Sequence, residues 1–273
     1  MVTNQQVSLN GGTFMMGSND FYPDEAPTEE VTVKAFEIDE HEVTNREFRK
    51  FIEATNYVTS AERSKELGFP ENGSAVFDAA SWKFVAGANW KHPEGPGSSI
   101  EGRDFDPVVQ ISLEDALAYA KWVGRRLPTE KEWEFAARSG MDGKAYAWGD
   151  EFNPDGEHMA NTWQGHFPSN NTADDGYMGR APVGCFPANE YGLYDIIGNV
   201  WEWTQDPYYP DRRNADGEGY DPRQPDIPVG VIKGGSYLCA ANFCARYRPA
   251  ARHAQDTGLG TNHIGFRTAA DIL

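Results

Sequence analysis

The chain has 273 residues and a formal net charge of −18, from 42 acidic and 24 basic side chains. This excess of negative charge argues against nucleic acid as a partner, because phosphates would be repelled; it suits solubility, cation binding or a basic peptide. Eight Trp, 28 Gly and 17 Pro predict a globular, loop-rich fold whose interior is packed by aromatic rings.

The N-terminal part of the chain is predicted to contain strands and one helix. Residues 7–17 are typical of two strands joined by a glycine turn. Residues 27–39 alternate apolar and polar side chains and predict one further half-buried strand. A capping box, Thr44-x-x-Glu47, opens the first predicted helix. Residues 60–106 are expected to be irregular and packed by their own aromatic rings.

Two more helices are predicted before residue 146. They open at Ser112-x-x-Asp115 and at Thr129-x-x-Glu132, both of which fit a capping box. From residue 146 onward helical periodicity is absent, and short strands with Gly, Asn and Asp turns are expected. Residues 206–228, rich in Asp, Pro, Gly and Tyr, are interpreted as an exposed loop.

The organisation of the whole chain favours a single domain over residues 1–273, because no linker or repeat interrupts it. The N-terminus shows neither the basic nor the apolar segment of a signal peptide. No apolar run approaches the roughly 18 residues of a membrane helix. Together with only three Cys, these features predict a cytoplasmic protein without a membrane partner.

Two of the three cysteines, Cys239 and Cys244, lie five residues apart. At that spacing a strand points the side chains to opposite faces, and a helix separates them by about 140°. An irregular turn through residues 240–242 would therefore have to bring the two sulfurs together. The alternative is that both cysteines pack as small hydrophobic residues. Cys185, with no second ligand type nearby, is expected to be a packing residue.

Two stretches, residues 161–177 and 194–202, are dense in the oxygen donors that Ca²⁺ prefers. Neither matches an EF-hand loop, so the spacing alone favours ordinary Asx turns over a metal site. A zinc site formed by Cys239, Cys244 and a distant His also stays open, although the paired-ligand pattern typical of zinc is absent. Four arginines near the C-terminus are expected to form salt bridges: Arg246, Arg248, Arg252 and Arg267.

Several sequence blocks occur in a characteristic order. They are Gly11-Gly-Thr-Phe-Met-Met-Gly17, Glu42-Val-Thr-Asn45, Arg126-Leu-Pro-Thr-Glu-Lys-Glu-Trp133, Tyr191-Gly-Leu-Tyr-Asp-Ile-Ile-Gly-Asn-Val-Trp-Glu-Trp203, Lys233-Gly-Gly-Ser-Tyr237 and Gly265-Phe-Arg267. Together they resemble the formylglycine-generating enzyme (sulfatase-modifying factor) family over nearly the whole chain. The resemblance implies an α/β (α+β) fold, similar to C-type-lectin-like domains, with little regular secondary structure.

The most specific block is Gly234-Gly-Ser-Tyr-x-Cys239-x4-Cys244-x-Arg-Tyr-Arg248, which resembles the family members that act on sulfatases. It implies oxidation by O₂ of a cysteine, within a Cys-x-Pro-x-Arg segment of a sulfatase polypeptide, to Cα-formylglycine. Cys239 and Cys244 would bind Cu(I), for which thiolates are the preferred soft ligands. Ser236 matches a serine that would position groups or relay a proton, and Trp201 matches a tryptophan that lines the pocket.

The resemblance also implies two calcium sites. Asn161, Thr162, Asp175 and Tyr177 would form the first, and Asp195, Gly198, Val200 and Glu202 the second. Four of these residues, Thr162, Tyr177, Gly198 and Val200, would contribute backbone carbonyls. His263 departs from the pattern, because several members have Asn there.

The resemblance further implies a bacterial protein, and we expect a monomer whose partner is an extended or unfolded sulfatase segment. Two alternative functions stay open at this stage. One is a non-catalytic binding module of the C-type-lectin-like kind, and the other is a related oxidase that acts on a small thiol. The sequence singles out no carboxylate for the substrate arginine.

Overall fold

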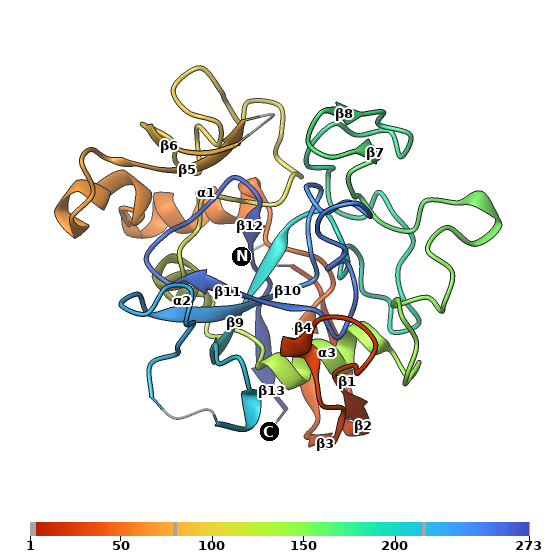
Figure 1. Ribbon diagram of the computed structural model, residues 1–273. Coiled ribbons are helices and arrows are strands. Elements are labelled where there is room, and N and C mark those ends of the chain that lie inside the picture. The colour runs from red at the N-terminus through yellow and green to blue at the C-terminus, as the bar shows by residue number, and fades with distance from the viewer. Residues whose placement is uncertain (1–3, 79–80, 215–216, 273) are drawn as a thin grey trace.

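The computed structural model describes residues 4–78, 81–214 and 217–272, and it shows a mixed α/β fold of short elements joined by long turns (Figure 1). The helices are α1 (Asn45–Thr55), α2 (Leu113–Trp122) and α3 (Glu130–Arg138), with 3₁₀ segments η1 (Pro23–Glu25), η2 (Ala61–Leu67), η3 (Pro154–Gly156) and η4 (Arg212–Asn214). The strands are β1 (Gln6–Leu9), β2 (Gly12–Met16), β3 (Glu29–Val33), β4 (Phe36–Asp39), β5 (Gly73–Asp78), β6 (Ser81–Ala86), β7 (Gly165–His166), β8 (Asn170–Asn171), β9 (Trp201–Pro207), β10 (Val229–Lys233), β11 (Arg252–Asp256), β12 (Ile264–Gly265) and β13 (Ala269–Asp271). Within the described residues, no helix is long and apolar enough to cross a membrane.

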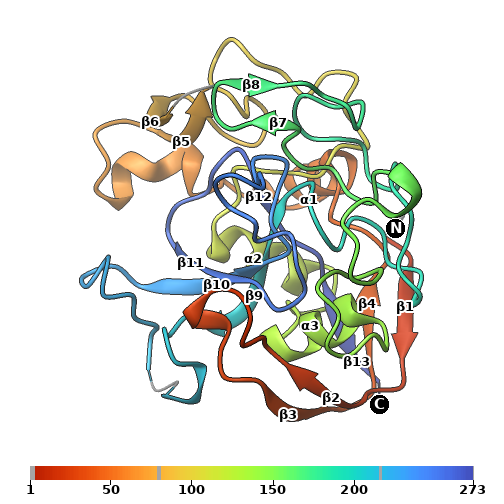
Figure 2. The same cartoon turned by 45° about the vertical axis from the view of Figure 1, so that its right-hand side comes forward.

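Two sheets form the centre of the molecule. One has the order β1-β4-β13 and is antiparallel; the other has the order β11-β10-β9-β12, in which β12 runs parallel to β9. Three two-stranded hairpins, β2-β3, β5-β6 and β7-β8, complete the strands of the described chain. Figure 2 shows β5-β6 and β7-β8 at one end of the molecule and β2-β3 at the other.

The three helix starts follow the predicted capping boxes. At α1 the Glu47 amide donates to Thr44 Oγ1 (3.3 Å), and the Thr44 amide donates to Glu47 Oε2 (2.8 Å). Reciprocal pairs of the same kind open α2 and α3. Each box satisfies amides that the first helical turn leaves without partners, so local sequence alone determines where these helices begin.

The structure corrects the prediction of one strand over residues 27–39, because β3 and β4 are separate strands in different sheets. The strands β1 and β2 likewise pair with β4 and β3, not with each other. Gly11 explains the arrangement: its φ is +70°, and a Cβ there would lie 2.5 Å from the Lys34 backbone. The segments at Gly11 and at Lys34 both pass from one sheet to the other here. Only glycine permits the two backbones to approach each other so closely.

The expectation of an irregular segment over residues 60–106 is wrong in part. It contains η2 and the β5-β6 hairpin. Most of β6 is exposed, including Trp82 and Phe84. An aromatic strand without a buried face lacks the apolar–polar alternation by which strands are recognised.

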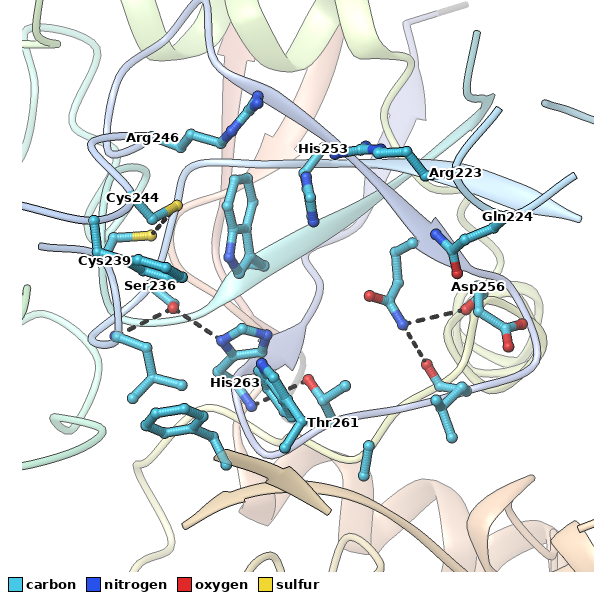
Figure 3. Close-up of a pocket in the computed structure, with 18 of the residues that line it drawn as sticks. Arg223, Gln224, Ser236, Cys239, Cys244, Arg246, His253, Asp256, Thr261 and His263 are labelled. Carbon is cyan, nitrogen blue, oxygen red and sulfur yellow. Dashed lines mark hydrogen bonds between the residues drawn. The ribbon is translucent and has the colours of Figure 1, made fainter. Parts of the chain in front are cut away.

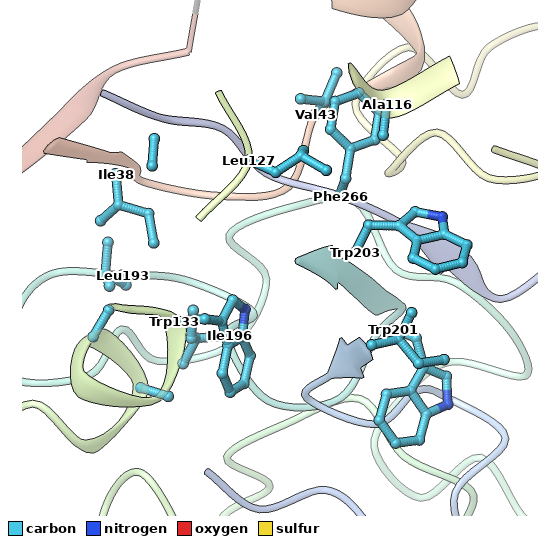
Figure 4. Packing of buried hydrophobic residues seen from close by; sticks show 14 of the residues in the cluster. Ile38, Val43, Ala116, Leu127, Trp133, Leu193, Ile196, Trp201, Trp203 and Phe266 are labelled. Atoms are coloured by element: carbon cyan, nitrogen blue, oxygen red, sulfur yellow. The ribbon is translucent and has the colours of Figure 1, made fainter. Parts of the chain in front are cut away.

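The hydrophobic core lies between the two sheets and the helices. Figure 4 shows Trp133 from α3, Trp203 from β9 and Phe266 packed among aliphatic side chains of the N-terminal and central segments. Ion pairs are buried in the same interior. Arg267 pairs with Glu202 (2.7 Å), Arg252 with Glu130 (2.7 Å), Arg248 with Glu25 (2.5 Å) and, partly exposed, Arg246 with Asp24 (3.1 Å). These pairs confirm the salt bridges expected for the four arginines.

Candidate active site

The turn that carries the cysteine pair begins where β10 ends. Gly234 and Gly235 adopt φ values of +93° and +77°, and a Cβ on Gly235 would lie 2.9 Å from the Tyr247 Cα. After this reversal the Cys239 amide donates to the Ser236 carbonyl (2.8 Å), and the Cys244 amide donates to the Ala240 carbonyl (3.0 Å). The two Sγ atoms lie 3.4 Å apart. An irregular turn therefore brings the sulfurs together, as the spacing predicted.

The two thiols differ in environment. Both are free; Cys239 is buried, and Cys244 is half-buried. Burial raises the pKa of Cys239 well above its usual range. The Cys239 thiol donates a hydrogen bond to the Cys244 sulfur, and this bond lowers the pKa of Cys244, helped by the positive charge of Arg246. The more exposed sulfur is thus the one that more readily becomes a thiolate, the form that binds metals.

The pair faces a cavity of about 620 Å³ that is open to solvent. Aromatic side chains from separate segments form much of its wall: Phe77, Trp82, Phe167, Trp201 and Phe243. Three of these rings stack in a row, with centroid distances of 5.2 Å for Phe77–Phe167 and 4.6 Å for Phe167–Phe243. Both cysteines therefore line an open cavity with their sulfurs turned toward each other, and the half-buried Cys244 is the more accessible of the two.

Ser236 and Trp201, both singled out by the sequence, line the same cavity. Ser236 Oγ lies 3.2 Å from His263 Nδ1 and accepts a hydrogen bond from the Leu238 amide (3.3 Å). Burial lowers the pKa of His263 to about 3. The imidazole is therefore neutral, and its Nδ1 can accept a hydrogen bond from the Ser236 hydroxyl.

The ring of Trp201 lies 5.8 Å from that of His253, measured between centroids, and the two are stacked. Burial also lowers the pKa of His253 to about 4. The described chain offers no hydrogen-bond partner to His253 Nδ1. Trp201, His253 and His263 thus form one part of the lining, the cavity floor. Figure 3 shows His253 and His263 between the cysteines and the opposite wall.

The far wall of the cavity was missed by the sequence analysis. The segment 206–228, interpreted only as an exposed loop, contributes Arg223, Gln224 and Ile227, and strand β11 contributes Gln255 and Asp256. Residues 215–216 of this loop lie outside the described residues. No local pattern marks these side chains, because they meet the cysteine turn only across the fold.

The first predicted calcium set comes together in the structure. Asn161 is fully buried, its Nδ2 donates to the Gly179 carbonyl (2.9 Å), and its Oδ1 is without a partner in the described chain. Asp175 accepts the amides of Thr162 (3.1 Å) and Tyr177 (3.0 Å). A buried amide oxygen without a partner beside a carboxylate fits the oxygen ligands of Ca²⁺.

The second predicted set contains Asp195 and Glu202, both buried. Asp195 Oδ2 accepts the Gly184 amide (2.6 Å), whereas Oδ1 has no partner among the described residues. Both oxygens of Glu202 already accept hydrogen bonds, from Arg267 (2.7 and 2.8 Å) and from Trp133 Nε1 (2.8 Å). Asp195 therefore offers a free donor atom, and the ligand role of Glu202 stays a prediction.

Glu42 is a further acidic residue at this place that the sequence analysis used only as part of a family block. It is fully buried, and neither carboxylate oxygen has a partner within the described chain. Burial, then the negative charges of Asp195 and Glu202, raise its pKa well above the usual range. The negative charges of Glu42, Asp195 and Glu202 all act on Arg267, and this excess of buried carboxylates suits a bound cation.

The two calcium sets are adjacent and lie directly behind the cysteine turn. The Asn199 amide donates to the Asn161 carbonyl (2.9 Å), and the Gly198 amide donates to the Gly234 carbonyl (2.9 Å). In the described residues, no three side chains of the His, Cys, Asp and Glu types gather as a metal site made of side chains alone would require. A cation there would depend on the backbone carbonyls that the resemblance assigns.

The third cysteine departs from its prediction. Cys185 is exposed, so the expectation that it packs in the interior is wrong. It lies beside Tyr177, whose pKa is raised to about 12, first by the hydrogen bond with Cys185. The flanking segment is a surface turn, and the sequence gives no apolar periodicity that would have distinguished the two cases.

Comparison with known proteins covers nearly the whole chain. A family model described as "Sulfatase-modifying factor enzyme 1-like domain" matches residues 2–272. The formylglycine-generating enzyme of Mycobacterium tuberculosis is 47% identical over 97% of both chains. The mouse protein "Inactive C-alpha-formylglycine-generating enzyme 2" is 42% identical over 97% of this chain and 85% of its own. Overall similarity alone therefore does not separate active from inactive relatives.

The fold is shared with a solved structure as well. PvdO from Pseudomonas aeruginosa superposes with a TM-score of 0.70 at 25% identity, over 98% of this chain and 95% of that one. The mixed α/β fold with little regular secondary structure is thus confirmed. The organisation of residues 1–273 as a single domain stays a prediction.

Proposed function

The chain belongs to the formylglycine-generating enzyme (sulfatase-modifying factor) family, and from this premise we propose that it is a copper-dependent oxidase of protein cysteines. Its substrate would be a cysteine in an extended Cys-x-Pro-x-Arg segment of a sulfatase, which it would convert to Cα-formylglycine with O₂. As a close homologue of formylglycine-generating enzymes, the chain is an oxidoreductase.

One observation carries the proposal: two free thiols lie 3.4 Å apart in the wall of an open cavity. Cys239 and Cys244 would hold Cu(I), because paired thiolates select a soft monovalent ion over the harder divalent ones. When bound, the ion would supply the redox chemistry toward O₂. The half-exposed Cys244 faces the space in which a substrate thiol would arrive.

The protein's own residues would position the substrate and handle protons. Trp201 would limit the movement of the substrate cysteine. Ser236 would position the substrate thiol or relay its proton, with the Ser236 hydroxyl held by Nδ1 of His263, which lies 3.2 Å away. The aromatic row of Phe77, Phe167 and Phe243 would cover the reacting atoms and reduce their contact with water.

The proposed conversion balances in two steps. Removal of two hydrogens, one from Cβ and one from sulfur, gives a thioaldehyde and transfers two electrons to O₂. If O₂ is reduced fully to water, two further electrons come from an added thiol reductant. Water then replaces sulfur at the carbon, and H₂S leaves with formation of the aldehyde.

The direct test is to incubate the protein with Cu(I), O₂, a thiol reductant and a Cys-x-Pro-x-Arg peptide. Mass spectrometry should show the change from –CH₂SH to –CHO, and an aldehyde-reactive probe should label the product. The same peptide with Ser in place of Cys is the matched control and should stay unchanged. Absence of aldehyde from the copper-loaded protein would contradict the proposal.

The calcium sites are proposed to support the active turn and to take no part in the chemistry. Asn161 Oδ1 and Asp195 Oδ1 are buried donors without partners. Asp195 lies on the segment whose Gly198 amide donates to the Gly234 carbonyl (2.9 Å), and Asn161 lies on the segment whose Trp163 amide donates to the Cys239 carbonyl (3.0 Å). Ca²⁺ at these places would neutralise buried negative charge and fix the backbone from which the cysteine turn departs.

A further inference from the structure

We propose that Asp256 binds the cationic side chain of the substrate segment and thereby determines which peptides the cavity accepts. The inference rests on the proposed function, because it takes a Cys-x-Pro-x-Arg segment as the molecule in the cavity. It assigns the role that the sequence left without a candidate, namely the carboxylate that meets the substrate arginine.

Asp256 is the last residue of strand β11 and lies in the cavity wall opposite the cysteines. Figure 3 shows the two sulfur atoms at one side of the pocket and Asp256 at the other, with His253 and His263 between them. Asp256 Oδ1 accepts the Gly258 amide (2.8 Å), and this bond holds the carboxylate in place. The side chain is only partly exposed, so a cation that reaches it meets a partly desolvated, pre-positioned partner.

The other charges of the wall are already compensated. Arg223 pairs with Asp221 (2.9 Å), and Arg246 pairs with Asp24 (3.1 Å) and stacks on the Tyr22 ring. In the described part of the chain, no Lys, Arg or His nitrogen forms an ion pair with Asp256. Asp256 is therefore the carboxylate in this wall whose charge is left for a ligand.

The length of the substrate segment limits where its arginine can bind. The arginine follows the reacting cysteine by four residues, so an extended segment spans at most about 14 Å between the two Cα atoms. With the cysteine at Cys244, the segment would extend past His253 toward the wall that carries Asp256 (Figure 3). The cavity thus offers a sulfur site and an anionic site for the two ends of one short segment.

The surroundings of Asp256 also suit an arginine. Ile227 and Leu259 line the same part of the cavity and provide apolar surface for an aliphatic stem. Asp256 Oδ2 has no partner in the described chain, and Oδ1 accepts only the Gly258 amide. A guanidinium can therefore donate to both oxygens at once, a geometry that an ammonium group cannot match.

A second apolar groove adjoins this wall. Asp256 and Ile227 belong to both spaces, and the groove is lined further by Leu67, Leu113 and Leu117. A polypeptide that places its arginine at Asp256 can therefore continue along the surface and need not end inside the cavity. This continuity fits a protein substrate better than a small thiol.

The test compares two peptides on two variants. One peptide carries the arginine, and the other carries citrulline, which keeps the shape and removes the charge. The native protein should show a kcat/KM for the arginine peptide about 10- to 100-fold above that for the citrulline peptide. Asp256→Asn should abolish most of this preference, because Asn retains an acceptor for the Gly258 amide but carries no charge.

Glu218→Gln is the matched control. Glu218 is exposed on the same loop as Arg223 and lies outside the residues that line the cavity. Its substitution removes the same unit of charge, so it should leave the arginine preference unchanged. Equal loss of preference in both variants would show a general effect of net charge and would overturn the assignment, as would an Asp256→Asn variant that still prefers arginine.

Binding without turnover separates this inference from the proposed function. Peptides with Ser in place of the reacting Cys, and with a fluorescent label, report affinity by anisotropy on the copper-free protein. The arginine form should bind about tenfold or more tightly than the citrulline form, and only when Asp256 is intact. If no peptide is oxidised, the proposed function fails, and this comparison still decides the role of Asp256. A charge-reversed pair, Asp256→Lys with Glu in the peptide, should recover binding.

Discussion

The cysteine turn and the buried carboxylates of Glu42, Asp195 and Glu202 are neighbours that differ in their exposure to solvent. Cys244 is half-buried and faces an open cavity, whereas Glu42 and Glu202 are fully buried and Asp195 nearly so. Backbone hydrogen bonds connect the two regions, among them those from the Gly198 amide to the Gly234 carbonyl and from the Tyr237 amide to the Asn199 carbonyl. Sulfur ligands that must meet a substrate are left accessible; carboxylates that cannot be reached serve the stability of the platform behind them.

Removal of either sulfur should separate activity from stability most strongly. Cys239→Ala or Cys244→Ala should lower aldehyde formation by roughly a thousandfold or more, equivalent to about 4 kcal/mol of transition-state stabilisation, because the paired ligand set is destroyed. The free energy of unfolding should fall by only about 1–2 kcal/mol. Product mass and urea titration measure the two effects.

Cys185→Ala is the control for the cysteine variants, since Cys185 is exposed and outside the cavity. It should keep native turnover. Full turnover by either variant of the pair would contradict the two-thiolate proposal.

Breaking the buried ion pair between Glu202 and Arg267 should lower the free energy of unfolding more than either cysteine substitution does. Glu202→Gln leaves Arg267 buried without its carboxylate, which should lower the free energy of unfolding by about 3–5 kcal/mol. The exposed pair of Lys83 and Asp78 provides the control, and Asp78→Asn should cost less than about 1 kcal/mol. If both variants lose the same free energy of unfolding, burial of the pair between Glu202 and Arg267 does not contribute to stability.

Chelation of calcium should destabilise the platform to a smaller extent. If the sites are filled to about 100 times their Kd, one ion contributes about 2.7 kcal/mol. For a chain of this size, removal should then lower Tm by about 5 °C. Differential scanning calorimetry with EGTA, and with Ca²⁺ added back, measures the effect, and Asp175→Asn should reduce the shift. An unchanged Tm with EGTA would count against both calcium sites.

Acidification should lower stability through the histidines of the cavity floor. The pKa values of His253 and His263 are lowered to about 4 and about 3 by burial, so both are neutral in the folded state. The unfolded chain takes up protons below about pH 6.5. Stability from these groups is therefore complete above that pH and is lost as pH falls toward 4, by up to about 1.4 kcal/mol per pH unit for each histidine.

The variant His263→Asn should flatten this pH dependence, measured by urea titration between pH 7 and pH 5. The exposed His166 offers the comparison, and His166→Gln should follow the native profile. If His263→Asn also follows the native profile, the folded protein does not hold that ring neutral.

Local sequence was sufficient wherever a contact is made within a few residues. The capping boxes at Thr44, Ser112 and Thr129 determined the helix starts, because the cap and its partner are three residues apart. The spacing of Cys239 and Cys244 correctly excluded a regular element between them. The ordered blocks along the chain identified the family, because they record the whole fold in short pieces.

Tertiary structure alone decided which charges are left unpaired. Arg267 meets Glu202 across 65 residues, whereas Glu42 and Asp256 are buried or half-buried without a cation in the described chain. The split of residues 27–39 into two sheets, and the exposure of Cys185, were settled in the same way. The physical reason is that periodicity and caps act over one turn or one strand, whereas an ion pair or a cavity wall depends on segments that only the folded chain brings together.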